Sequence, residues 1–131
     1  MKRNLIYHTH IAVENIVAVE TSSGECNTQL EAIARDGLTL TCNRKTLDQL
    51  LPNTVSISPK QPKNLNIHFQ LNDAFEAIQS SCEVYSLRRL ARDTFQLDMR
   101  FNALEENHFK QIDNYIENSL KQLQPQLKQV A

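Results

Sequence analysis

One dense cluster of positive charge stands out in the sequence, where Arg88, Arg89 and Arg92 lie close together. A guanidinium carries five N–H donors in a planar fork that fits the oxygens of a phosphate or a carboxylate. The flanking residues read as two strands joined by a short turn, with apolar residues at alternate positions from 95 to 101. A turn needs none of the three arginines for its geometry. The cluster therefore predicts a surface for an anionic ligand or an acidic partner, and the alternative is a solvated rim partly neutralised by Glu83 and Asp93.

Other combinations of reactive side chains give weaker signals. His8 and His10 could point to one side of an extended strand, but a metal site needs at least one more ligand, and no Cys or acidic residue is placed to supply it. The sequence has only two glycines, with no phosphate-binding glycine loop and no nucleophile elbow. We therefore predict no metal, no cofactor and no enzymatic activity, and we keep His10 as a candidate for ligand or partner contact.

The composition is that of an ordinary soluble domain. The 131 residues fit a single domain, 1–131, with 40% hydrophobic and 22% charged residues. Fourteen basic and 15 acidic residues give a net charge of −1, which favours neither a nucleic acid polymer nor an anionic membrane as partner. The start of the chain has neither a signal-peptide nor a membrane-span pattern. Cys26, Cys42 and Cys82 form no Cys-x-x-Cys pair, so we interpret them as reduced, buried residues of a cytoplasmic protein.

Strand patterns outnumber helix patterns along the chain. Alternating or continuous apolar runs predict strands at 11–19, 27–34, 38–42, 65–71, 75–87 and 94–101. Asp36 and Gly37 form a hairpin signal between the second and third of these. Asn43 is placed to cap a short helix that Pro52 ends. Six short strands at this spacing are typical of a barrel or a sandwich.

A helix is predicted at 103–123. Asn102 followed by Glu105 is a capping-box pattern, and one apolar stripe follows it. The stripe consists of Leu104, Phe109, Ile112, Ile116, Leu120 and Leu123. The stripe fits a helix packed on its own barrel, since a sheet must cover its apolar face. The pattern could continue past Pro125, so the last turns are also candidates for a homodimer contact.

This strand and helix layout, over about 11–120, resembles that of PilZ domains, the bacterial receptor modules for cyclic di-GMP. The resemblance implies a mainly β fold, namely a six-stranded antiparallel barrel at about 11–101 with a short inserted helix and a C-terminal α-helix. It also implies a role in cyclic di-GMP-linked signalling, for example in the regulation of motility or biofilm formation.

PilZ domains that bind cyclic di-GMP carry an Arg-x-x-x-Arg element and, about twenty residues later, Asp/Asn-x-Ser-x-x-Gly. The second element aligns with residues 32–37, where Gly37 is kept but Ala32 and Ala34 replace the two hydrogen-bonding residues. The arginines of the first element would fall on Ile6 and His10. The sequence thus resembles a degenerate member that lacks most of the ligand residues.

Two functional hypotheses follow from the resemblance. In the first, the chain is a non-enzymatic regulatory or adaptor domain that acts by protein–protein contact and binds cyclic di-GMP weakly or not at all. In the second, it is a cyclic di-GMP receptor that uses other basic residues in place of the lost ones. The candidate residues for ligand or partner contact are His10, Arg35, Asp36, Gly37, Arg88, Arg89 and Arg92.

Overall fold

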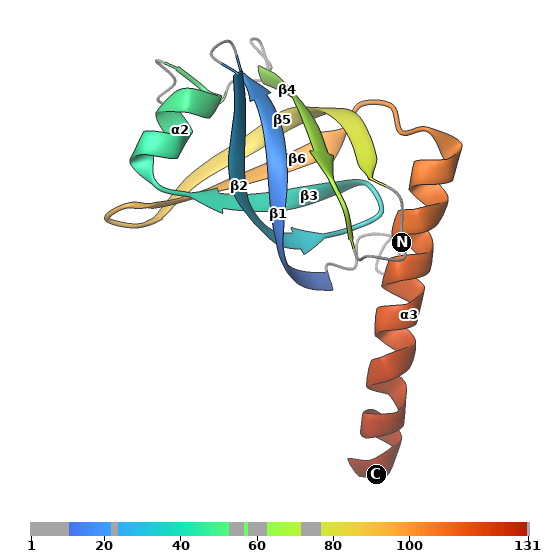
Figure 1. The fold of residues 1–131 in the computed structure, drawn as a ribbon. Coiled ribbons are helices and arrows are strands. Elements are labelled where there is room, and N and C mark those ends of the chain that lie inside the picture. The colour runs from blue at the N-terminus through green and yellow to red at the C-terminus, as the bar shows by residue number, and fades with distance from the viewer. Residues whose placement is uncertain (1–10, 22–23, 53–56, 58–62, 72–76, 131) are drawn as a thin grey trace.

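The computed structural model describes residues 11–21, 24–52, 57, 63–71 and 77–130 (Figure 1). Within these residues it contains six strands and two helices. The strands are β1 (Ile11–Thr21), β2 (Gly24–Ile33), β3 (Gly37–Cys42), β4 (Lys63–Phe69), β5 (Ile78–Ala91) and β6 (Thr94–Phe101). The helices are α2 (Arg44–Leu50) and α3 (Glu106–Val130). The predicted start of the fifth strand at residue 75 lies outside the described residues, as does His10.

The strands close into an antiparallel barrel in the order β1-β2-β3-β6-β5-β4. Closure depends on the pairing of β1 with both β2 and β4, which places Val17 opposite Thr28 on one side and Phe69 on the other. The second long-range pair joins β3 to β6, from Gly37 opposite Arg100 onward. This architecture confirms the predicted six-stranded antiparallel barrel.

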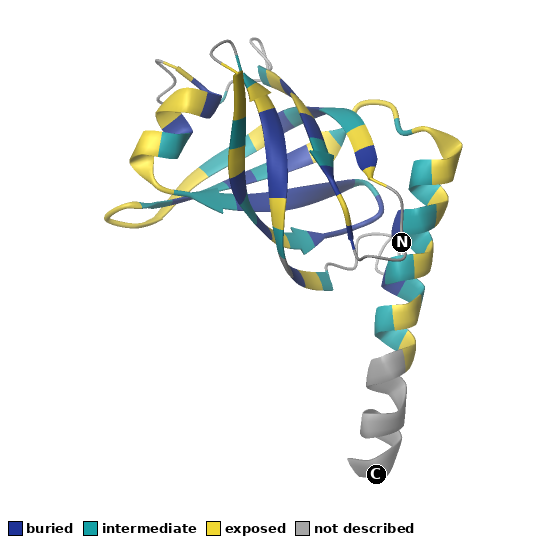
Figure 2. Ribbon diagram, viewed as in Figure 1, coloured by how far each residue is buried: buried dark blue, intermediate teal, exposed yellow. Residues whose placement is uncertain are grey.

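The barrel interior is built from alternate residues of each strand, because successive side chains of a strand point to opposite faces. In β6, for example, Phe95, Leu97 and Met99 are buried, whereas Gln96 and Asp98 are only partly covered. Figure 2 shows the same alternation of buried and exposed positions around the barrel. The fully buried aliphatic residues include Val17, Val19, Leu30, Ile33, Leu40, Ile78 and Leu97.

The β5–β6 hairpin contains the longest of the described strands. β5 has 14 residues, and its register against β6 shifts between Val84 and Ser86 and again between Arg89 and Ala91. A bulge of this kind bends and twists the strand that carries it. The end of the hairpin projects beyond the barrel (Figure 1).

Helix α2 begins as the sequence predicts. The side chain of Asn43 accepts a hydrogen bond of 2.8 Å from the backbone N–H of Thr46, which is an N-cap interaction. Leu47 and Leu50 are buried against the barrel, and the helix ends at Leu50, before Pro52.

Helix α3 begins later than the capping-box pattern predicts. The side-chain amide of Asn102 donates to Asn64 and Ser81 over 2.9 Å each, and its backbone N–H donates to the Ser81 carbonyl. Asn102 therefore joins the segment before α3 to the barrel, and the prediction that it caps the helix is wrong. Instead, the carbonyl of Glu105 accepts the N–H of Phe109. The helix also runs to Val130 rather than ending near residue 123.

Helix α3 packs on its own barrel, as predicted. Ile112 and Ile116 are both fully buried, and they belong to the main hydrophobic core. Leu104, Tyr115 and Leu120 are partly buried against the same core. The homodimer contact through the last turns stays a prediction.

Candidate functional site: the β2–β3 turn and the arginine-rich hairpin

The turn between β2 and β3 contains three of the candidate residues and is held by backbone hydrogen bonds. The N–H of Ala34 donates to the carbonyl of Gly37, and the N–H of Phe101 donates to the carbonyl of Asp36, both over 2.9 Å. A β-carbon on Gly37 would collide with the carbonyl oxygen of Met99 on β6. Glycine is therefore required here by the close approach of β6, and not by the left-handed backbone angle that an Asp-Gly hairpin signal predicts.

Arg35, in the same turn, is buried with 6% of its side chain exposed. Its Nε donates to Oδ1 of Asp113 and its Nη2 donates to Oε1 of Glu117, both over 2.6 Å. The two carboxylates lie about one helical turn apart on α3. The guanidinium thus binds α3 to the β2–β3 turn. Sequence reasoning missed this role because the partners lie 78 and 82 residues away.

Arg89 stabilises the tip of the β5–β6 hairpin. Its Nε donates to the carbonyl of Ala91 over 3.2 Å, and its Nη2 donates to the carbonyl of Arg92 over 2.8 Å. Its guanidinium carbon also lies 5.9 Å from the centre of the Phe95 ring. The expectation that the turn needs none of its arginines is therefore wrong for Arg89.

Arg88 and Arg92 are more available to a partner. The side chain of Arg88 is 58% exposed, and its Nη2 lies 3.6 Å from Oδ2 of Asp98, which is a weak contact. Oδ1 of Asp98 already accepts hydrogen bonds from Thr39 and Gln96, over 2.9 and 3.2 Å. Arg92 lies in the exposed turn itself.

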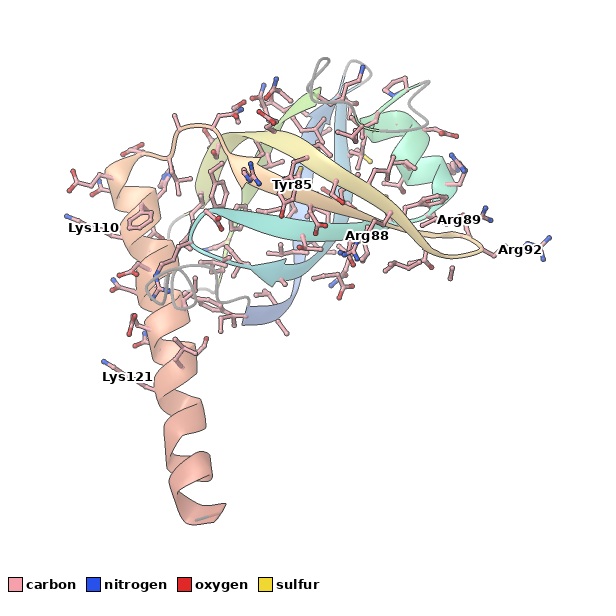
Figure 3. The ribbon with its side chains drawn as sticks, turned by 180° about the vertical axis from the view of Figure 1, so that it is seen from behind. Tyr85, Arg88, Arg89, Arg92, Lys110 and Lys121 are labelled. Atoms are coloured by element: carbon pink, nitrogen blue, oxygen red, sulfur yellow. The ribbon has the colours of Figure 1, made fainter. Side chains whose placement is uncertain are left out.

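The structure does not bring all the candidate residues together. Arg35, Asp36 and Gly37 lie at the turn that contacts α3. Figure 3 shows Arg88, Arg89 and Arg92 towards the tip of the long hairpin, on the side away from α3 and its Lys110 and Lys121. The candidates therefore form two separate groups, one at α3 and one at the hairpin tip.

A stacked pair that the sequence did not reveal lies between these two groups. The guanidinium carbon of Arg100 is 4.4 Å from the centre of the Tyr85 ring, and 42% of Tyr85 is exposed. Arg100 lies directly opposite Gly37 in the β3–β6 ladder. Burial and the nearby carboxylate of Asp98 raise the pKa of Tyr85. The local signal was hidden because the bulge at Tyr85 changes which residues of β5 and β6 are neighbours.

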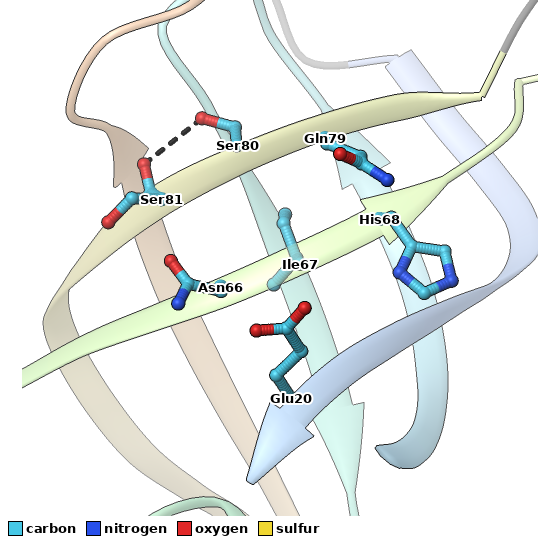
Figure 4. Close-up of a pocket in the computed structure, with 7 residues that line it drawn as sticks. All are labelled: Glu20, Asn66, Ile67, His68, Gln79, Ser80 and Ser81. Carbon is cyan, nitrogen blue, oxygen red and sulfur yellow. Dashed lines mark hydrogen bonds between the residues drawn. The ribbon is translucent and has the colours of Figure 1, made fainter.

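The outer surface of β1, β4 and β5 bears a shallow polar depression of about 280 Å³ (Figure 4). Its polar side chains include Glu20, Asn66, His68, Gln79 and Ser81. In the ladder, Asn66 lies between Glu20 and Ser81, and His68 lies opposite Gln79. Such amide and hydroxyl groups can form hydrogen bonds with a polar molecule at this open surface.

The described part of the chain was compared with what a metal site or a reactive thiol requires. There, no group of three or more His, Cys, Asp or Glu residues could hold a metal ion. Cys82 is fully buried, and this burial raises the pKa of its thiol to about 12. Burial, together with Cys26 and Asp93, raises the pKa of Cys42 to about 11. Both groups are therefore neutral thiols at physiological pH and poor nucleophiles.

No helix among the described residues is both long and apolar enough to cross a membrane.

Comparisons with known proteins give a clear result for the fold alone. No protein-family model and no curated protein sequence matches the chain. Among solved structures, the chain is similar to the Bacillus subtilis inhibitor of motility MotI/DgrA, with a TM-score of 0.68 and 9% identity over 88% of this chain and 51% of that one. It is also similar to YcgR from Escherichia coli in complex with c-di-GMP, with a TM-score of 0.64 and 9% identity over 95% and 50% of the two chains.

The similarity covers only part of these longer chains, and in YcgR that part is a separate domain. The chain spans about half the length of MotI/DgrA and of YcgR. The separate PilZ domain of YcgR with c-di-GMP is matched over 95% of its length and 92% of this chain, with a TM-score of 0.61 and 9% identity. The fold is therefore PilZ-like, which confirms the resemblance in architecture.

Proposed function

We propose that this chain is a non-enzymatic regulatory or adaptor domain of the PilZ type in bacterial cyclic di-GMP-linked signalling. It acts in the cytoplasm by contact with another protein, and it binds cyclic di-GMP weakly or not at all. Support comes from the PilZ-like fold. This chain shares the fold with an inhibitor of motility and with proteins whose structures hold c-di-GMP.

The observation that carries this proposal is the state of the β2–β3 turn. Ala32 and Ala34 offer no side-chain hydrogen bond where the receptor pattern has two polar residues. The one arginine of the turn, Arg35, is buried and bound by Asp113 and Glu117. A nucleotide at this turn would have to displace two carboxylates from the guanidinium, and each charge-assisted hydrogen bond is worth about 1.5–3 kcal/mol.

A second candidate function, a cyclic di-GMP receptor with non-standard basic residues, is favoured by one observation. The guanidinium of Arg100 stacks on the Tyr85 ring directly opposite Gly37. A planar cation on an aromatic ring is a surface on which a nucleobase can stack and next to which a phosphate can bind. Arg88 lies on the same strand as Tyr85 and would be the nearest further cation of the hairpin.

Calorimetric titration of the full chain with cyclic di-GMP separates the two. We expect a Kd weaker than about 10 μM, or no binding. The loss of two neutral hydrogen bonds and two arginine contacts costs several kcal/mol, at about 0.5–1.5 and 1.5–3 each, and about 1.4 kcal/mol is tenfold in affinity.

Submicromolar binding would contradict the adaptor function. If such binding were lost in Arg100→Ala but kept in the control Lys121→Ala on α3, the receptor function at the Tyr85–Arg100 pair would replace it.

A further inference from the structure

Helix α2 adds cations to the tip of the β5–β6 hairpin. The helix begins with Arg44 and Lys45. The backbone N–H of Arg44 donates to Oδ1 of Asp93 in the hairpin turn over 2.9 Å, and its guanidinium carbon lies 4.5 Å from the centre of the Phe95 ring. The first turn of α2 and the hairpin tip are thus one surface, although more than forty residues separate them in the chain.

Two guanidinium groups of this surface, those of Arg44 and Arg89, are held in place before any partner arrives. Phe95 is 5% exposed, and its ring lies within 6 Å of both Arg44 and Arg89. Arg89 is fixed further by the carbonyls of Ala91 and Arg92. A side chain that is already ordered loses less conformational entropy when it binds.

The surface has an excess of positive charge that stability does not explain. Cations in the first turn of a helix face the positive end of its dipole, and α2 has no acidic residue there. The five cations are Arg44, Lys45, Arg88, Arg89 and Arg92. Three carboxylates lie near this end of the same elements, namely Asp48, Asp93 and Asp98, whereas Glu83 of β5 lies opposite Arg100, away from the tip. Asp93 accepts a hydrogen bond from the α2 backbone and Asp98 accepts hydrogen bonds from Thr39 and Gln96, and together with Asp48 they supply three negative charges against five positive ones. Repulsion between neighbouring like charges is a local cost, and local costs of this kind are expected at functional sites.

An exposed apolar residue is adjacent in the chain to these cations. Leu90 is 53% exposed, one of the few large apolar residues of the described chain that is open to solvent to this extent. It lies between Arg89 and Ala91 at the end of β5. An exposed apolar residue surrounded by charge is the arrangement found at the centre of many protein interfaces, where a polar rim encloses a desolvated anchor.

We propose that this tip surface (Arg44, Lys45, Arg88, Arg89, Leu90 and Arg92) binds an acidic segment of a partner protein that also offers an apolar side chain to Leu90. The inference rests on the proposed function, namely that the domain acts by protein contact. Carboxylates at fixed spacing use the bidentate forks of ordered arginines. A lipid surface needs no such order, and a single exposed leucine would add little membrane affinity.

The test uses the full chain and a fluorescein-labelled synthetic peptide of eight residues, in which six Asp and Glu residues flank one Leu and one Phe. Fluorescence anisotropy at low salt gives the affinity, and amide chemical shifts of ¹⁵N-labelled protein locate the site. We expect binding that weakens as salt is raised, with shift changes confined to residues 44–45 and 88–93. The double variant Lys45→Glu/Arg92→Glu should lose about tenfold or more in affinity, since it reverses two charges at the interface.

Two controls make the result specific. Lys121→Glu makes the same kind of charge change on α3, and it should alter the affinity less than twofold. Leu90→Ser should weaken binding of the Leu/Phe peptide but not of a polyglutamate peptide of equal charge.

The proposal is overturned if no peptide binds at about 1 mM, if Lys121→Glu matches the double variant, or if the tip binds phosphatidylserine vesicles but not the peptide. If the chain binds cyclic di-GMP tightly and also binds the peptide through the tip surface, only the proposed adaptor function is contradicted. The inference about the tip surface then stands.

Discussion

Arg35 and Asp113 are joined by a hydrogen-bonded ion pair of 2.6 Å across 78 residues of sequence. The arginine is buried, whereas 40% of the aspartate side chain and 47% of the Glu117 side chain are exposed. The desolvated charge is therefore that of Arg35 on the barrel. The carboxylates of Asp113 and Glu117 on α3 compensate for it. The position of α3 therefore determines whether the guanidinium of Arg35 has these two carboxylates as partners.

The two sides of this ion pair should differ in their effect on stability. Arg35→Met leaves two half-exposed carboxylates that water can solvate, so we expect a loss of about 1 kcal/mol. Asp113→Ala/Glu117→Ala leaves a buried guanidinium without its carboxylates, and we expect a loss of about 3–5 kcal/mol. Urea unfolding measures both values.

The matched control for the ion pair is Glu106→Ala. It breaks the exposed pair with Lys110, whose charged atoms lie 3.5 Å apart, and it should cost only about 0.3–0.5 kcal/mol. A loss in Arg35→Met as large as that in the double variant would contradict the expected difference between the two sides of the ion pair.

Gly37→Ala should destabilise the barrel strongly. The new β-carbon would meet the backbone of Met99, which cannot move without parting β3 from β6. We expect a loss of about 3 kcal/mol or more, at the upper end of overpacking effects. Thermal unfolding gives the value. Gly24→Ala is the comparison, because only its backbone angle (φ +123°) is unfavourable and no atom blocks the new methyl group. Equal stability of Gly37→Ala and wild type would refute the close-approach explanation.

The arginines of the hairpin should separate into one that stabilises the turn and one that does not. Arg89→Glu removes two hydrogen bonds to turn carbonyls, and we expect a loss of about 1–2 kcal/mol. Arg92→Glu changes an exposed residue of the turn and should stay within about 0.5 kcal/mol of wild type. Chemical denaturation of the two single variants measures both losses of stability. A larger loss in Arg92→Glu than in Arg89→Glu would show that Arg92, and not Arg89, stabilises the turn.

Burial of Cys82 should make the stability of the protein fall at alkaline pH. The pKa of the thiol is raised to about 12 from an ordinary value of 9.0. Above pH 9 the unfolded state releases this proton while the folded state keeps it, so the free energy of unfolding decreases as pH rises from about 9 towards 12. The slope has an upper limit of about 1.4 kcal/mol per pH unit for this one group.

Urea unfolding of wild type and Cys82→Ala at pH 8.5, 9.5 and 10.5 tests the thiol effect, since other groups titrate equally in both proteins. The difference in the free energy of unfolding between wild type and Cys82→Ala should decrease as pH rises. A constant gap would mean that Cys82 ionises as readily in the fold as in the unfolded chain.

Local patterns were sufficient to predict most of the fold. The alternation of Phe95, Leu97 and Met99 predicted β6 with its correct bounds. A strand has a period of two residues, so its pattern can be recognised from residues that are close together in the sequence. The cap at Asn43 was also found, since donor and acceptor lie three residues apart.

The missed features depend on distant partners. Asn102 has the same local cap pattern as Asn43, but Asn64 and Ser81 compete for its amide, and neither is near it in sequence. The hydrogen bonds of Arg35 to α3 could not be predicted either, because Asp113 and Glu117 are also distant from it in sequence. The Tyr85–Arg100 stack requires the register of two strands and the bulge between them. Site residues were therefore harder to predict than strands, because a site is made of contacts between elements.

Closure of the barrel has a consequence for the order of folding. The β5–β6 hairpin needs only a tight turn, with Ala91 opposite Thr94, and hairpins form in about 1–10 μs. The β3–β6 pair must join residues as distant as Thr39 and Asp98, which are 59 positions apart, and such non-local sheets fold in milliseconds to seconds. For most of that interval the hairpin has an unpaired edge on β6, and an unpaired edge invites association with other chains. The arginines at its tip would repel a second copy of the same hairpin while this edge is unpaired, which disfavours association of two partly folded chains.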